Sequence, residues 1–397
     1  MSKIFKIFVI FALFYILFAN FNICNICSIC RAEELDEQED TLYSEVERQL
    51  DNIDFNDLEQ LYDNMDDEVK SVLGYDSFNS FVRAILNGEE NLSIESVINY
   101  ILSSFKKLTV KLLPTIMVIV AIAFIYNIFS KMVNSSIKNI VYLICFVTIV
   151  LSVFVLCKNS IVKVKEVILS VRDQMNLVFP ILLTLMTAIG GVTSVTIYKP
   201  VVSFLSVLIV NVCSDILIPI VLYILVFTIA GNLNENVKLT KFIDLLKSVF
   251  KWCIGLCTSV YLIFLSVKCV SASLSDGVSI RATRYAIKNY IPYLGNFLSE
   301  GVDVIHAGSV LLKNSIGVGA VLMLLVIVIL PLVELLVLSM LLKFGSGVLE
   351  PLSDGKISNF LTSLAKCMEM LVACLSCVGF MYFITILLMI GSANTIV

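Results

Sequence analysis

Residues 317–342 read GVGAVLMLLVIVILPLVELLVLSMLL and carry a single charged side chain, that of Glu334. Because an α-helix rises about 1.5 Å per residue, this stretch is long enough to cross the roughly 30 Å hydrocarbon core of a bilayer. Pro331 lies three residues before Glu334 and predicts an interruption of the helix. The stretch therefore predicts a membrane-spanning helix that contains a break and a charge on one face.

The rest of the chain has the same apolar character. Its 397 residues are 58% hydrophobic and 15% charged, whereas a soluble protein has roughly 45–50% apolar and about 25% charged residues. Further apolar segments occupy residues 112–129, 139–157, 176–190, 196–213, 215–231, 252–270 and 369–390. We therefore expect an all-α polytopic membrane protein with about eight apolar membrane segments.

The net charge of −4 conceals a strong asymmetry along the chain. Residues 33–90 contain 19 acidic and three basic residues, which gives this segment a balance of −16 and leaves +12 for the remainder. An acidic region is therefore joined to a basic membrane body. Apolar residues at helical spacing predict that residues 33–108 form a small helical region, which ends in an amphipathic helix capped by Ser93.

The N-terminus predicts that this acidic region is exported. Two lysines precede an apolar run at residues 7–19, which is too short to span a bilayer, and a stretch ending at Ala32 follows. We interpret residues 1–32 as a secretory signal peptide, with an uncleaved membrane anchor as the alternative. Either interpretation places residues 33–108 outside the cytoplasm.

The membrane body divides into a hairpin and two similar units. The predicted parts are a transmembrane hairpin at 109–160, repeat A at 161–271, repeat B at 272–392 and a tail at 393–397. Pro180 and Pro292 are 112 residues apart, and so are Pro219 and Pro331. These equal spacings favour an internal duplication. The alternative is that membrane sequences built from few residue types resemble one another.

Two charged segments predict structure at the membrane surface. Residues 158–173 place lysine, arginine and acidic residues among apolar residues at helical spacing, which predicts an amphipathic surface helix. Residues 232–251 carry four lysines against two acidic residues. The positive-inside rule therefore places this second segment in the cytoplasm.

Glycines and prolines interrupt several of the apolar segments. The expected helix breaks are Gly190, Gly191, Pro200, Pro219, Pro292 and Pro331. Interrupted helices at corresponding positions of two repeats surround the substrate pathway in many transporters. The same pattern here would mark a pathway between repeats A and B.

Charged residues in or near the spans are the candidate functional residues. A charge at membrane depth costs at least about 2.5 kcal/mol and normally faces water or a partner, so Glu334 lines a passage, pairs with a partner subunit or lies near the interface. Residues 272–316 carry too many charges for lipid-facing helices and form a polar vestibule or a solvated helix pair. The candidates are Asp276, Arg281, Glu300, Asp303, His306, Lys313 and Glu334.

No motif indicates catalysis. The chain has no Gly-x4-Gly-Lys-Ser/Thr phosphate loop and only one histidine, His306. Cys374 and Cys377 have the spacing of a metal or redox pair, but their apolar surroundings favour thiols packed as small apolar residues. We therefore expect no enzymatic activity, no metal or cofactor, and no nucleic-acid partner.

Several ordered motifs resemble those of one bacterial family. The motifs are SDGVSIRA at 275–282, YIPYLG at 290–295, LLKNSIG at 311–317, GGVTS at 190–194 followed by Pro200, and LEPL at 349–352. Together they resemble the stage III sporulation protein AE family of endospore-forming bacteria. The resemblance covers about residues 95–392, together with the signal and a variable acidic region.

This resemblance implies a multi-pass subunit of the channel-like, secretion-like complex that links mother cell and forespore during engulfment and supports late forespore development. It implies a location in the mother-cell-derived membrane around the forespore. The implied partners are the other stage III A operon proteins, AA to AH, of which AA is a cytoplasmic ATPase, and the forespore Q protein. The alternative function is a membrane scaffold that anchors partner proteins without forming a conduit itself.

Overall fold

The structure, a computed structural model, describes residues 36–51, 53, 55–65, 70, 73–87, 94–132, 135–233, 239–263, 295–351 and 355–391. The expected signal peptide and tail lie outside these residues. Every regular element within the described ranges is a helix, and no strand occurs among them. The expectation of an all-α fold is therefore confirmed.

The acidic region forms short helices and the membrane body forms long ones. In chain order the helices are α3 (Asp36–Asp51), α4 (Asn56–Asp63), α6 (Phe78–Leu86), α7 (Ile94–Met132), α8 (Ser135–Ala188), α9 (Val192–Asn211), the π-helix η1 (Val212–Leu217), α10 (Ile218–Leu233), the helix Thr240–Ile263, α12 (Gly295–Leu349) and α13 (Lys356–Gly391). Because η1 joins α9 to α10 without a break, the three form one helical path.

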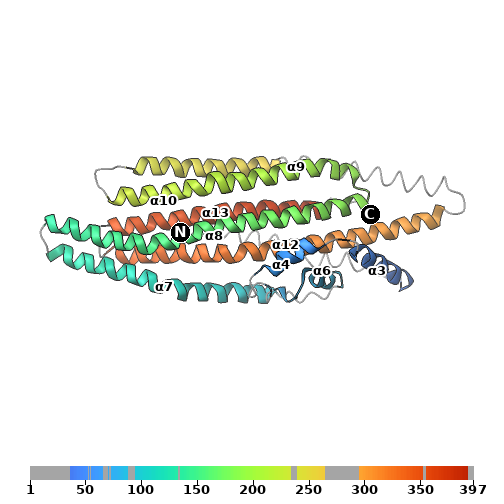
Figure 1. Cartoon of the computed structure of the whole chain (residues 1–397), viewed down its shortest axis with the longest axis horizontal. Helices are drawn as coiled ribbons and strands as arrows, with labels where there is room; N and C mark the ends of the chain where they lie inside the picture. The colour runs from blue at the N-terminus through green and yellow to red at the C-terminus, as the bar shows by residue number, and fades with distance from the viewer. Residues whose placement is uncertain are drawn as a thin grey trace.

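The long helices lie side by side along the longest axis of the molecule and alternate in direction (Figure 1). α12 lies in the middle of this bundle, with α7 and the short acidic helices on one side and with α8 and α13 on the other. α9, α10 and the helix Thr240–Ile263 form an outer layer over α8 and α13. α12 therefore connects the acidic region to the rest of the bundle.

Within the described residues, six helical paths are long and apolar enough to cross a membrane, rather than the eight segments expected. The difference arises because α8 contains 139–157 and most of 176–190, and α9–η1–α10 contains both 196–213 and 215–231. The predicted surface helix at 158–173 is amphipathic, but it is the middle of α8. No glycine or proline lies between residues 157 and 180 to end that helix.

The helices also run through prolines at which breaks were expected. Pro200 lies inside α9 and Pro331 inside α12, while Pro219 lies in α10 two residues after η1. A proline removes one backbone hydrogen bond, and a local bend or a π-helical turn can absorb that loss. Gly190 has a φ of 91°, and the chain reverses direction between α8 and α9 at Gly190 and Gly191 (Figure 1). Pro292 lies outside the described residues.

The interface between the two proposed repeats is filled by apolar side chains. Val178 and Leu182 of α8 and Leu375 of α13 are fully buried. The ring of Phe179 lies 6.4 Å from that of Tyr382 across the same interface. α8, α12 and α13 therefore share one continuous core.

The two proposed repeats have a common helical pattern. In each unit a long proline-containing helical path, α9–η1–α10 or α12, precedes an antiparallel helix, Thr240–Ile263 or α13. The two long paths run in the same direction in the bundle (Figure 1). The duplication and its boundaries nevertheless stay predictions, because these helical paths share a pattern that simple bundles also adopt.

Candidate functional site

The candidate residues from the sequence fall into three groups. Asp276 and Arg281 lie outside the described residues. Glu300 and Asp303 lie on the backbone of α12, where their side chains are not described. His306, Lys313 and Glu334 follow along α12 and have described surroundings. The site can therefore be built from the polar contacts that α12 makes with its neighbours.

Lys313 is buried completely in the middle of the bundle. Its Nζ atom donates a hydrogen bond of 2.7 Å to the carbonyl oxygen of Ile390, next to the last residue of α13. A cation is favoured at this position because the C-terminal end of a helix presents unpaired carbonyl groups with partial negative charge. Lys313 therefore holds the end of α13 against α12 and does not line an open space in the described chain.

Gly317 allows this close approach of α12 and α13. A β-carbon at this position would lie 2.5 Å from the Cγ1 atom of Ile390, which is closer than two carbon atoms approach without displacement. One turn further on, the buried Gln174 of α8 donates a hydrogen bond of 2.8 Å to the carbonyl oxygen of Ala320. α12 is therefore hydrogen-bonded to α13 at Lys313 and to α8 at Ala320, within two helical turns.

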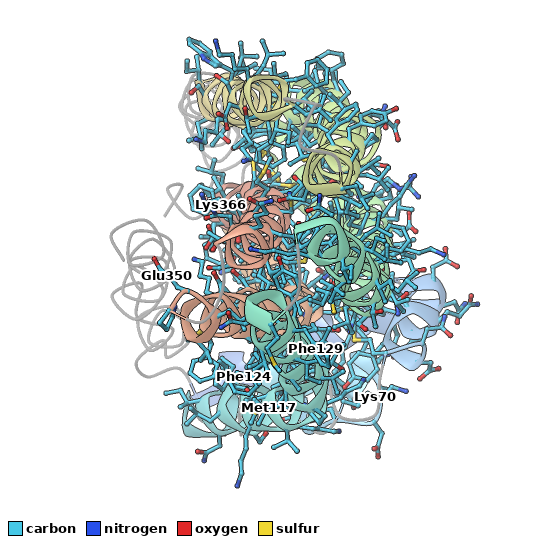
Figure 2. The ribbon with its side chains drawn as sticks, turned by 90° about the vertical axis from the view of Figure 1, so that its left-hand side faces the viewer. Lys70, Met117, Phe124, Phe129, Glu350 and Lys366 are labelled. Atoms are coloured by element: carbon cyan, nitrogen blue, oxygen red, sulfur yellow. The ribbon has the colours of Figure 1, made fainter. Side chains whose placement is uncertain are left out.

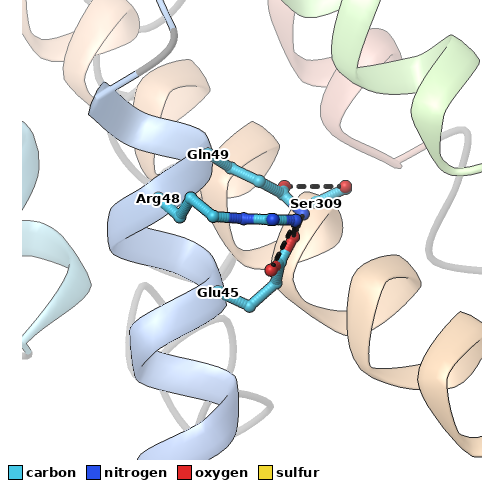
Figure 3. Close-up of polar contacts among 4 residues, drawn as sticks. All are labelled: Glu45, Arg48, Gln49 and Ser309. Carbon is cyan, nitrogen blue, oxygen red and sulfur yellow. Dashed lines mark hydrogen bonds and ion pairs between the residues drawn. The ribbon is translucent and has the colours of Figure 1, made fainter.

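The acidic region packs on the same part of α12. Ser309 donates a hydrogen bond of 2.9 Å to the side-chain oxygen of Gln49 on α3, and Gln49 in turn donates to Glu45 (Figure 3). The hydrogen bond from Gln49, followed by that from Arg48, lowers the pKa of the Glu45 carboxyl group. His306 lies one turn before Ser309 and is buried.

Apolar contacts complete this docking of the acidic region. Phe78, Phe81 and Ile85 of α6 are buried, and they surround the position where a β-carbon on Gly319 would lie. His306 and Lys313 therefore lie in packed helix contacts. The expected vestibule stays a prediction, because the side chains of its other members, Asp276, Arg281, Glu300 and Asp303, are not described.

Glu334 finds its cation within the same chain. Its carboxylate pairs with the Nζ atom of Lys163 on α8, and the two side chains are 25% and 44% exposed. Nine residues further along α12, Lys343 pairs with Glu369 of α13. The sequence left three alternatives for Glu334, namely lining a passage, pairing with a partner subunit or lying near the interface. The pair with Lys163 supplies a counter-charge without a passage or a partner subunit.

Sequence reasoning did not find Lys163, Gln174 or the pair Lys343–Glu369. Gln174 is an uncharged polar residue at the start of a long apolar stretch, which is a weak signal for a buried hydrogen bond. The two ion pairs join residues on different helices, and Lys163 and Glu334 are 171 residues apart. Only the packing of α8, α12 and α13 brings these partners together.

The polar contacts of α12 are suited to holding helices together. No group of three metal-binding side chains occurs in the part of the chain that the structure describes. A shallow groove of about 400 Å³ lies between α8 and α10, with Lys165 and Glu166 on one wall and Pro219 and Tyr223 on the other. On α12, Lys313 is hydrogen-bonded to a backbone carbonyl oxygen, and Glu334 and Lys343 are ion-paired, so the arrangement favours a structural role over a chemical one.

Comparison with known proteins identifies relatives of the whole membrane body. The profile of the family described as Stage III sporulation protein AE matches residues 77–393. Stage III sporulation protein AE of Bacillus subtilis (strain 168) is 23% identical over 371 residues, which are 91% of this chain and 92% of that protein. No solved structure matches the chain.

Proposed function

Because the chain belongs to the stage III sporulation protein AE family, we propose that this sporulation-related membrane protein is a subunit of the channel-like complex between mother cell and forespore. The long apolar helices agree with a multi-pass subunit. The family is not a known enzyme family, and the described charges on α12 take part in helix contacts. The chain then contributes structure to the complex, and chemical work comes from partners such as the AA ATPase.

The packed interface between the two proposed repeats supports a scaffold role for a single chain. Val178, Leu182 and Leu375 are fully buried, and Phe179 of α8 packs against Tyr382 of α13, where a passage between repeats would run. This packing favours the scaffold form of the function, in which one chain anchors partners and does not itself enclose a conduit. A conduit built by several chains is compatible with the same packing.

The acidic region supplies the surface through which partners are anchored. It docks on α12 near the end of the bundle that also holds the C-terminal end of α13 (Figure 1). If the predicted signal peptide exports this region, both lie on the extracytoplasmic side of the mother-cell-derived membrane. There they are accessible to the other stage III A operon proteins, AA excepted, and to the forespore Q protein.

Thiol accessibility tests whether one chain encloses a passage. We would introduce Val178→Cys or Leu375→Cys into the full chain and apply a membrane-impermeant maleimide to sporulating cells that depend on the variant. Asn176→Cys is the matched control, since Asn176 lies two residues from Val178 on the exposed face of α8. The scaffold form predicts labelling of Asn176→Cys alone. Labelling of Val178→Cys and Leu375→Cys at a comparable rate would contradict it.

A further inference from the structure

Three helices of the bundle lie in register at Tyr142 of α8. The ring of Tyr126 on α7 lies 5.5 Å from the ring of Tyr142. The Tyr142 hydroxyl donates a hydrogen bond of 3.2 Å to the carbonyl oxygen of Asn232 near the end of α10. Heights along α7, α8 and α10 can therefore be counted in residues from these three positions.

From the Tyr142 level, the outward faces of α7, α8 and α10 stay apolar over nearly the same length of helix. Counting from the Tyr142 level, the first charged residue is Lys111 on α7, Lys158 on α8 and Asp215 in η1, which precedes α10. These lie 15, 16 and 17 residues away, which corresponds to about 23–26 Å of helix. The exposed large side chains in between include Val118, Phe124, Leu143, Leu151, Leu222 and Val226. Figure 2, a view along the bundle, labels three of the exposed apolar residues of α7, namely Met117, Phe124 and Phe129.

The length of this apolar surface matches a bilayer. On α8 it extends past Tyr142 to Lys138, and no charged residue lies between Lys138 and Lys158. The two lysines are 20 positions apart, which corresponds to about 30 Å of helix, the thickness of the hydrocarbon core. Thr148 is exposed within this stretch, and its hydroxyl donates to the carbonyl oxygen of Ile144, so that it offers no free donor to lipid.

Beyond Lys158 the same helix has a different outer face. Its exposed side chains there include Lys165, Glu166, Asp173, Asn176 and Thr184. Its apolar side chains in this part, such as Ile168, Val171 and Met175, are buried against the other helices. The 30 residues from Asn159 to Ala188 extend about 45 Å further. This half of α8 has the pattern of a helix in a water-soluble protein.

On the α9–η1–α10 path, the exposed face is also less apolar on the α9 side of Asp215. The exposed residues of α9 alternate polar side chains, including Thr196, Lys199 and Ser203, with Phe204 and Val207. By contrast, the large exposed side chains of α10 are all apolar or aromatic. The transition on this path lies at η1, at the height of Lys158.

The opposite face of the bundle carries charges at the height of the apolar surface. Lys356 of α13 lies over the ring of Tyr142, so Lys366 of α13 lies about 15 Å above the Tyr142 level. The ring contact of Phe227 with Phe242 places the exposed Asp244 at a similar depth. Because charges at membrane depth face water or protein, we expect no lipid at Lys366 and Asp244, whereas Phe242, Leu245 and Trp252 are exposed apolar side chains of the same helix as Asp244.

We propose that the bilayer contacts the surface of α7, α8 and α10 at the heights between Lys138 and Lys158 of α8, and that the half of the bundle beyond Lys158 stands in water. The acidic helices and the C-terminal end of α13 belong to this aqueous half. Apolar segments such as 176–190 are then part of a water-soluble core and not membrane spans. The proposal does not depend on the function proposed above.

Spin labels on α8 test this placement in the full chain reconstituted in phospholipid vesicles. We would attach a nitroxide at Leu151→Cys and at Asn176→Cys and measure collisions with oxygen and with a water-soluble nickel chelate, using the parent chain as background. Both positions are exposed, so they differ only in the solvent expected. Leu151→Cys should favour oxygen at least about tenfold relative to Asn176→Cys, which should favour nickel.

Each alternative gives a different result. Low collision rates with both reagents at Leu151→Cys would show that another protein chain covers the surface, which would overturn the proposal. A preference for oxygen at Asn176→Cys would show that lipid also covers the second half of α8, and would overturn it as well. If either variant is poorly folded, Leu143→Cys and Asp173→Cys make the same comparison.

Discussion

The first and second halves of α8 are parts of one unbroken helix, yet they expose different side chains. Before Lys158 the large exposed residues are apolar, as at Leu143, Leu151 and Phe154. After Lys158 the helix exposes mostly charged and polar residues and buries its apolar ones. The hydropathy of a segment therefore shows only how apolar it is. The side chains that the segment exposes determine whether lipid or water contacts it.

Replacing exposed residues of the two halves by aspartate should give the largest difference. Leu151→Asp places a carboxylate in the hydrocarbon, where insertion scales assign about 2.5–3.5 kcal/mol near a helix centre. Asn176→Asp should change stability by less than about 0.5 kcal/mol, because its side chain lies in water. Denaturant titration of the full chain in bicelles would measure both. Equal losses would remove the distinction between the halves.

The two ion pairs of α12 lie at different heights relative to Lys158. Glu369 lies 13 residues after Lys356, below the height of Lys158, whereas Lys163 lies five residues beyond it. Lys343→Met would leave Glu369 without its cation at membrane depth and should cost about 2 kcal/mol. Lys163→Met should cost less than about 1 kcal/mol, because Lys163 is more exposed than Lys343, at 44% against 33%, and its pair lies beyond the proposed bilayer surface.

The same titration measures these two variants, and salt provides the control. Added salt should reduce the contribution of Lys163 more than that of Lys343, since exposed charges are screened more strongly than sheltered ones. Losses of equal size and equal salt dependence would place the two pairs in one environment.

Two glycines of α12 test how tightly the aqueous half is packed. Gly317→Ala should destabilise the chain by about 1–2 kcal/mol, because the new methyl group would meet Ile390 at 2.5 Å. Gly347→Ala is the matched control on the same helix, with no atom within 4 Å of its new methyl group. It should stabilise the helix by about 0.5–1 kcal/mol. Thermal unfolding in bicelles distinguishes the opposite signs, and a gain for both would refute the tight packing.

The smallest effect should come from the contact between the acidic region and α12. Ser309→Ala and Gln49→Ala each remove the hydrogen bond between them, and a double-mutant cycle should give a coupling of about 0.5–1.5 kcal/mol. Limited proteolysis within residues 36–65 would report the loosening of α3. A coupling of zero would show that α6 alone docks the region.

Much of the bundle was predictable because helical periodicity is local. The spacing of Ile161, Val164 and Ile168 predicted an amphipathic helix at 158–173, and those side chains are buried as that pattern requires. The sequence could not show that this helix continues without a break in both directions. Its position relative to the membrane depends on which face its neighbours cover.

The polar contacts of α12 were less predictable. Lys313 was a candidate because of its charge, but its acceptor is a backbone carbonyl oxygen 77 residues away, and every sequence offers such an acceptor everywhere. Pro331 predicted a break that the structure does not have, because α12 is held by close packing on both sides of it. Contacts between residues far apart in the sequence depend on how the helices pack, so local sequence patterns do not predict them.

A cryo-electron microscopy map of the full chain in lipid nanodiscs would show directly where the bilayer contacts the bundle. We predict disc density against α7, α8 and α10 between the heights of Lys138 and Lys158, with residues 159–188 and the acidic helices outside the disc. Disc density that surrounds residues 159–188 would contradict this account.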